Sequence, residues 1–176
     1  RCGIMNVPIT YPPVPLEGFM VSGLMTPEEE ARYTYPEDLK EKILRAVGDY
    51  VVNIDIPKYD VENIEDAFRF FKDIKYSLEK RIEAFFYLMD SERWDFFMAV
   101  FIFADRIQHL FWKYLEPESR FFKAKHAPLI REKIRECFAL FDTFLAGLLR
   151  KVDRETGVMI MSDHGFGSTH AWFNVN

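Results

Sequence analysis

Residues 94–103 (WDFFMAVFIF) form an almost unbroken apolar stretch, which is followed by Ala104 and Asp105. The stretch is too short to span a membrane, since a membrane-spanning helix needs about 20 apolar residues. Strands that are buried on both faces of a parallel sheet have this unbroken apolar pattern. Residues 94–103 therefore predict a buried strand of an α/β sheet, and Asp105 follows its carboxyl end.

Two long helices are expected on either side of this strand. Apolar side chains at steps of three or four residues predict a helix over residues 60–89, with Asp60 as its N-cap. Pro128 is expected to open a second helix that reaches about residue 148. Residues 158–161 (VMIM) then predict another short strand. The order of strand, helix and strand predicts parallel neighbours with a right-handed connection, and hence an α/β fold with a mainly parallel sheet flanked by helices.

Shorter elements are expected before residue 60. Residues 3–10 and 18–21 are predicted to be extended pieces at sheet edges or in crossover connections, because a proline-rich bend separates them. Pro36 is expected in the first turn of a short surface helix. Residues 51–56 (VVNIDI) predict one more short strand.

The composition is that of an ordinary globular chain, with 49% apolar and 29% charged residues among 176. The formal net charge of -5 argues against a surface that neutralises nucleic-acid phosphates, so no nucleic-acid partner is expected. Cys2 and Cys137 have no spacing typical of a disulfide framework or a Cys-based metal site. This cysteine usage favours a reducing compartment, and together with the lack of an evident membrane segment it predicts a cytoplasmic protein.

Two Asp/His pairs are the candidate functional residues. Asp105 and His109 are four residues apart, so one helical turn would place both side chains on the same face. Asp163 and His164 are adjacent and precede a glycine-containing turn. Carboxylate oxygen combined with imidazole nitrogen suits zinc, and also manganese or iron. Two pairs suggest two divalent ions, which could bind the attacking and leaving oxygens of a phosphoryl displacement. Asp105 and His109 alone would also fit an N-cap followed one turn later by a surface or core histidine.

The segments DRIQHLFW (105–112) and MSDHGFG (161–167) resemble the alkaline phosphatase superfamily, and in particular its type I phosphodiesterase and nucleotide pyrophosphatase branch. The segment NVPITYPPVPLEGFMVSG (6–23) resembles the same branch. The resemblance implies that residues 1–176 are a partial alkaline-phosphatase-like sandwich. Residues 27–90 would be a helical insertion over the active site, and residues 91–176 would be the metal-binding α/β core.

The resemblance also implies roles for single residues. Asp105 and His109 match the ligands of one ion, zinc or alternatively manganese, and Asp163 and His164 match those of the other. A Thr or Ser nucleophile is expected upstream of Arg1 and a further histidine ligand beyond the last residue, so the chain is expected to be an internal fragment. Ser168 and Thr169 are then loop residues, and His170 is at most an outer contact of the metal or substrate.

The function expected from these features is a metal-dependent phosphoester hydrolase, a phosphodiesterase or nucleotide pyrophosphatase, in the full-length protein. Its substrate would be a small phosphoester such as a nucleotide. The implied mechanism is covalent: a metal-activated hydroxyl attacks phosphorus, an alcohol or phosphate leaves, and metal-bound water then hydrolyses the phospho-enzyme. A phosphomutase, a sulfatase and a non-catalytic fragment or interaction module are the alternatives.

Overall fold

The computed structural model describes residues 1–27 and 32–168. The chain divides into two compact units, Arg1–Phe103 and Ala104–Asn176. Every strand in the described ranges belongs to the first unit. The expectation that residues 27–90 are an insertion over the active site stays a prediction.

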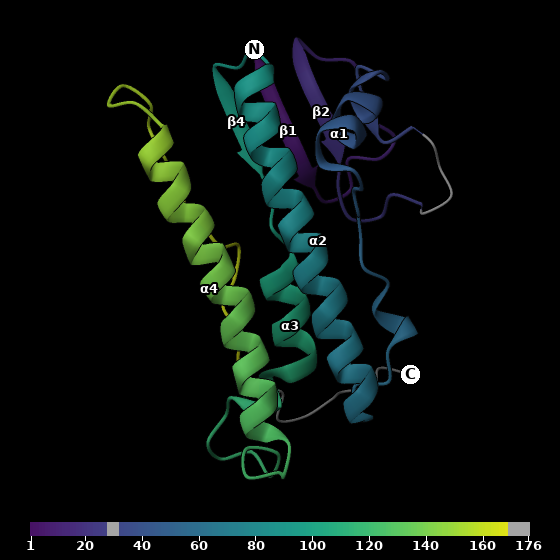
Figure 1. Ribbon diagram of the computed structural model, residues 1–176, viewed down its shortest axis with the longest axis vertical. Helices are drawn as coiled ribbons and strands as arrows, with labels where there is room; N and C mark the ends of the chain where they lie inside the picture. The colour runs from purple at the N-terminus through teal and green to yellow at the C-terminus, as the bar shows by residue number, and fades with distance from the viewer. Residues whose placement is uncertain (28–31, 169–176) are drawn as a thin grey trace, which may run out of the picture. The chain divides into compact units, whose positions relative to one another are not determined.

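The first unit is built on a four-stranded sheet with the order β3-β2-β1-β4. Its strands are β1 (Cys2–Val7), β2 (Gly18–Ser22), β3 (Thr34–Tyr35) and β4 (Phe96–Ala99), and Figure 1 shows β4, β1 and β2 side by side. β1 is parallel to both β2 and β4, whereas β2 and β3 are antiparallel. The predicted mixed α/β fold with a mainly parallel sheet is confirmed. The prediction that residues 3–10 and 18–21 lie at sheet edges or in crossover connections is wrong, because β1 and β2 are the two inner strands of this sheet.

Three predicted strands differ from the structure. In residues 94–103 only Phe96–Ala99 is a strand, and a helix begins at Phe103. Residues 51–56 and 158–161 form no strand, and the latter are exposed, with Met159 at 84%. An apolar run becomes a strand only where another strand pairs with its backbone, and composition does not supply that partner.

Two helices complete the first unit: α1 (Leu39–Val47) and α2 (Ile64–Ser91), with the 3₁₀ turn η1 (Ile56–Lys58) before α2. Pro36 precedes α1 and lies outside it. The α2 side chain Phe85 stacks on Phe97 of β4 at 4.8 Å between ring centroids, and Phe97 also meets Phe19 of β2 edge-on at 5.2 Å. These aromatic rings join α2 to the sheet, as the apolar stripe of α2 predicts.

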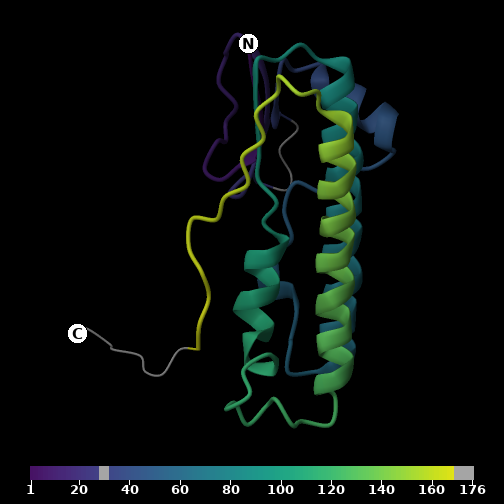
Figure 2. The same cartoon turned by 90° about the vertical axis from the view of Figure 1, so that its left-hand side faces the viewer.

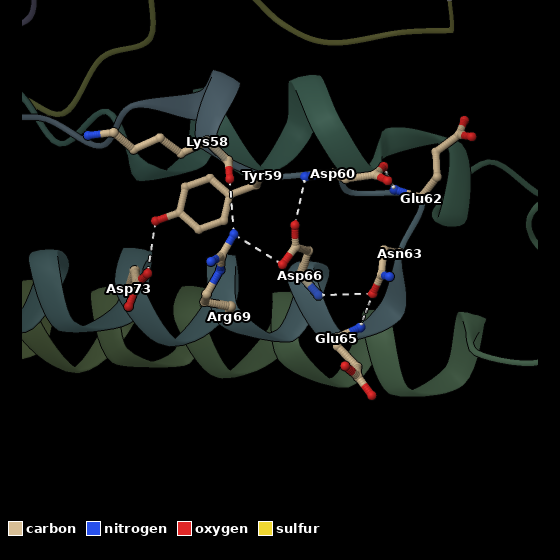
Figure 3. Close-up of polar contacts among 9 residues, drawn as sticks. All are labelled: Lys58, Tyr59, Asp60, Glu62, Asn63, Glu65, Asp66, Arg69 and Asp73. Carbon is tan, nitrogen blue, oxygen red and sulfur yellow. Dashed lines mark hydrogen bonds and ion pairs between the residues drawn. The ribbon is translucent and has the colours of Figure 1, made fainter.

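The N-terminus of α2 is capped by Asn63 and not by Asp60, as Figure 3 shows. The Asn63 side-chain oxygen accepts hydrogen bonds from the backbone N–H groups of Glu65 at 2.9 Å and Asp66 at 3.3 Å. The Asp60 carboxylate instead accepts from the backbone N–H of Glu62 at 3.1 Å. An N-cap must lie directly before the first helical residue, and the helix begins at Ile64.

Side chains of α2 also hold the loop that precedes it (Figure 3). The Tyr59 hydroxyl donates to the Asp73 carboxylate at 2.8 Å. Arg69 pairs with Asp66 at 3.0 Å and donates to the carbonyl oxygen of Lys58 at 3.0 Å. These bonds fasten Lys58 and Tyr59 to the first turns of the helix.

Arg81 is buried in α2, which the apolar stripe did not predict. Its guanidinium donates to the carbonyl oxygens of Val100 at 3.2 Å and Val52 at 2.9 Å, and its Nε has no partner among the described residues. Burial lowers the pKa of Arg81, and the hydrogen-bonded Tyr50 opposes that shift. A buried charge held mainly by carbonyl dipoles is stable only if these hydrogen bonds are kept.

The second unit holds α3 (Phe103–Phe111, which starts at the unit boundary), the 3₁₀ turn η2 (Trp112–Tyr114) and α4 (Ala127–Lys151). Pro128 lies in the first turn of α4, as predicted. Figure 2 shows the chain leaving the end of α4 and running back in the opposite direction as an extended segment. No described helix combines the length and apolar character that crossing a membrane requires.

Candidate metal centre

Helix α3 places the first predicted pair. Ile107 and Phe111 are fully buried, so Asp105 and His109 lie on the other side of the helix. The Oδ1 atom of Asp105 is 3.2 Å from Nε2 of His109. Asp105 is in the first turn, where the helix dipole favours a carboxylate, and its side chain is 29% exposed. The predicted one-turn spacing therefore brings the two donor atoms together.

The segment after α4 brings the second pair to the first. Nε2 of His164 lies 3.9 Å from the same Oδ1 of Asp105 and 3.7 Å from Oδ1 of Asp163. Asp105 is thus close to two imidazoles, one from α3 and one from the segment 162–168. The Asp163 side chain is 89% exposed, and the contact that joins it to this group is the one with His164.

The backbone around His164 orients its ring. Nδ1 of His164 lies 2.9 Å from the carbonyl oxygen of Gly165, so in the neutral ring the proton is on Nδ1 and Nε2 carries a lone pair toward Asp105. The Gly165 carbonyl raises the pKa of His164 above its ordinary value, and the carboxylates of Asp163 and Asp105 add to this. This tautomer is the one that binds a metal through Nε2.

Phe166 contacts both histidines and Glu116 lies near them, and neither was among the predicted site residues. The Phe166 ring meets the His109 ring edge-on at 4.8 Å and lies 5.4 Å from the His164 ring. The Glu116 carboxylate accepts from Nε1 of Trp112 at 3.1 Å and from Oγ of Ser168 at 3.3 Å. The signal that could have found the aromatic residues is their position within the two motifs, since Phe166 is two residues after His164 and Trp112 is three residues after His109.

The donor set fits zinc or manganese only in part. Donor atoms of a tetrahedral zinc site are roughly 3.3 Å apart, given zinc–ligand distances of about 2.0–2.2 Å. The Asp105–His109 distance matches this value, whereas His164 and Asp163 stand farther away. Within residues 1–27 and 32–168, no three His, Cys, Asp or Glu side chains form a group that could hold a metal ion. The first pair thus has ligand spacing, and the second would have to move closer. Thr169 and His170 lie outside the described residues.

The mainly parallel sheet and the two Asp/His pairs define an α/β protein with a candidate metal centre. A family model, that of the type I phosphodiesterase / nucleotide pyrophosphatase family, matches residues 1–176. The chain therefore belongs to this family of phosphoester hydrolases, and the family resemblance of its motifs is confirmed. Searches of curated proteins and of solved structures found no match.

Proposed function

We propose that the protein is a metal-dependent phosphodiesterase in which Asp105, His109, Asp163 and His164 hold two divalent ions, zinc or manganese. The observation that carries the proposal is the position of Asp105, whose Oδ1 lies 3.2 Å from one imidazole and 3.9 Å from another. Family membership supports phosphodiester hydrolysis over the phosphomutase and sulfatase alternatives. The substrate proposed is a small phosphodiester or nucleotide.

Bound ions would supply positive charge for the attacking and leaving oxygens of the phosphoryl group. The residues of the candidate centre would bind these ions and hold their ligand atoms in position. His109 and His164 present ring nitrogens, Asp105 lies between them, and the Gly165 carbonyl keeps the His164 proton on Nδ1. Ser168 donates its hydroxyl to Glu116 and is not assigned as a nucleophile. The family resemblance implies a hydroxyl nucleophile that is not among the residues assigned here, so activity is proposed for a protein that carries it.

The test is hydrolysis of bis(4-nitrophenyl) phosphate by the full-length protein after chelator treatment and reloading with zinc or manganese. Asp105→Asn keeps the shape of the side chain but weakens it as a metal ligand, and it should lower kcat/KM by about 100-fold or more and reduce the bound metal. Asp142→Asn is the matched control, because Asp142 is an exposed residue of α4 outside the centre. Full activity and metal content in folded Asp105→Asn would show that the proposal is wrong.

Metal titration distinguishes the proposed phosphodiesterase from the alternative of a non-catalytic interaction module. A module of that kind would fold normally and give no calorimetric signal with zinc or manganese. Saturable binding by the full-length protein, lost in Asp105→Asn and kept in Asp142→Asn, would exclude the interpretation that both Asp/His pairs are ordinary surface residues.

A further inference from the structure

A buried network of hydrogen bonds lies in the first unit, at the carboxyl ends of the parallel strands β2, β1 and β4. It runs from Ser22, the last residue of β2, through Asn6, Tyr50 and Arg81 to Val100, the residue after β4. Open parallel sheets bind their ligands beyond the carboxyl ends of the strands. The network therefore lies at the edge of the sheet where the geometry of a site is set.

Asn6 is the residue through which β1 enters the network. The register of β1 against β2 shifts between Met5 and Val7, and Asn6 has a left-handed φ of 56°. Asparagine tolerates this conformation, and an extra residue of this kind in a strand re-aims its side chain. The Asn6 carboxamide donates to the carbonyl oxygen of Ser22 at 3.0 Å and accepts from the Tyr50 hydroxyl. The irregular strand end thus links β1 and β2 to Tyr50.

Arg81 extends the network to β4. It is hydrogen-bonded to Tyr50, and its guanidinium donates to the carbonyl oxygen of Val100 at 3.2 Å. The backbone N–H of Val100 donates to the carbonyl oxygen of Met5 in β1 at 2.9 Å. Both backbone polar groups of Val100 are therefore held, one by the sheet and the other by Arg81.

Val100 is the first residue of the connection from β4 to α3. Helix α3 begins at Phe103, whose side chain is buried, and Asp105 follows in the first turn of the same helix. A short connection thus separates the fixed backbone of Val100 from the helix that carries Asp105. Because the start of this connection is fixed, the network limits the positions open to the Asp105 carboxylate.

Stability alone does not account for a buried arginine in α2. Taking a charged group out of water costs several kcal/mol, and apolar replacements of buried charged groups are often neutral or stabilising. A fully hydrogen-bonded polar network, in contrast, fixes the relative positions of the groups that it joins. Arg81 joins Tyr50 and Val100, and fixed backbone geometry is what its hydrogen bonds supply.

We propose that Arg81 is a positioning residue of the candidate metal centre. Together with Tyr50 and Asn6 it holds the carboxyl ends of β1, β2 and β4, and so fixes the backbone that leads to Asp105. It acts through this backbone and not on the ion or the substrate. The inference rests on the proposed function, because it treats Asp105 as a metal ligand.

Tyr50→Phe tests the network, because it removes one hydroxyl and keeps the ring. Amide hydrogen exchange in the peptide 100–105 of the chelator-treated full-length protein measures how firmly this backbone is held. Tyr50→Phe and Arg81→Met should each speed this exchange by about tenfold. Each should also weaken zinc binding by about tenfold, measured by competition with a chromophoric chelator. The control Tyr33→Phe should change neither value, because the buried Tyr33 ring stacks on Tyr50 at 6.2 Å but its hydroxyl is not a link of the network.

The double variant Tyr50→Phe/Arg81→Met distinguishes one shared network from two separate effects. If both residues act through the network, the double variant should weaken zinc binding by about tenfold, as each single variant does. Independent effects would multiply to about 100-fold, and that result would contradict the network. A merely structural role would lower the thermal stability and leave the zinc affinity of the folded protein unchanged.

The two measurements separate this inference from the proposed function. Unchanged exchange in the peptide 100–105 of both variants would overturn the inference, whatever the activity. Faster exchange with unchanged zinc affinity would also overturn it, while the proposed function stands. If wild type binds neither zinc nor manganese, the proposed function fails, and faster exchange in both variants would still support the network as the element that positions the backbone before Asp105.

Discussion

Phe166 connects the two halves of the candidate centre, because its ring contacts both His109 and His164. Groups that orient metal ligands change metal affinity by about 10- to 100-fold when they are removed. Phe166→Leu should therefore weaken zinc binding by about tenfold, and Phe166→Tyr should keep it. Competition with a chromophoric chelator measures the affinity, and Phe138→Leu on the exposed side of α4 is the control. If Phe166→Leu and wild type bind zinc with equal affinity, Phe166 does not orient the metal ligands.

Arg81 allows a comparison of buried charge with lost hydrogen bonds. Lysine would keep a buried charge but lacks the planar fork that reaches both Val52 and Val100. Methionine removes the charge and leaves two carbonyl oxygens without this partner. Arg81→Lys should lower the free energy of unfolding by about 2–3 kcal/mol, and Arg81→Met by about 1 kcal/mol. Urea unfolding followed by circular dichroism tests this order, and a lysine variant more stable than the methionine variant would contradict it.

At the scale of the helices, the N-cap of α2 gives a direct test of local structure. Asn63→Ala removes the acceptor for two backbone N–H groups and should lower the free energy of unfolding by about 1 kcal/mol. Asn63→Asp should retain the cap. Because the helix begins at Ile64, Asp60→Ala should lower the free energy of unfolding less than Asn63→Ala does. A larger decrease in Asp60→Ala than in Asn63→Ala would show that Asp60 is the cap.

The Tyr59–Asp73 bond at the start of α2 makes stability depend on alkaline pH. Partial burial, then the hydrogen bond to Asp73, raises the pKa of Tyr59 to about 12 from its ordinary 10. As the pH rises, the Tyr59 hydroxyl loses its proton in the unfolded chain before it does so in the folded chain. The contribution of the Tyr59 bond to the free energy of unfolding is therefore complete below pH 10 and is lost as the pH rises to about 12. Urea unfolding at pH 9 and 11 should show the decrease, and Tyr59→Phe should reduce it. If the free energy of unfolding of Tyr59→Phe decreases by the same amount between pH 9 and 11, another group causes the decrease, for example Tyr33, whose pKa is also about 12.

The helices could be predicted from sequence because their signal is local. The apolar period and Pro128 place α2 and α4 within a few residues of their observed bounds. The same local geometry predicts that Asp105 and His109 meet, since four residues make about one turn. The prediction of a strand at residues 158–161 was wrong, because a strand forms only where another strand elsewhere in the chain pairs with it. Arg81, Phe166 and Glu116 were missed for the same reason, because tertiary contacts give them their roles.

At the scale of the whole molecule, metal binding and folding should be coupled if the two Asp/His pairs close around ions. A ligand that binds only the folded state stabilises it by about 2.7 kcal/mol at 100 times its Kd. For a domain of about 150–250 residues, 1 kcal/mol shifts Tm by about 2–4 °C, so zinc added to the chelator-treated protein should raise the Tm of this domain by about 5–10 °C. His164→Ala should abolish most of the shift, because this ring joins the segment after α4 to Asp105. His126→Ala, a histidine at the start of α4, should keep it. An equal shift in both variants would place the ion elsewhere.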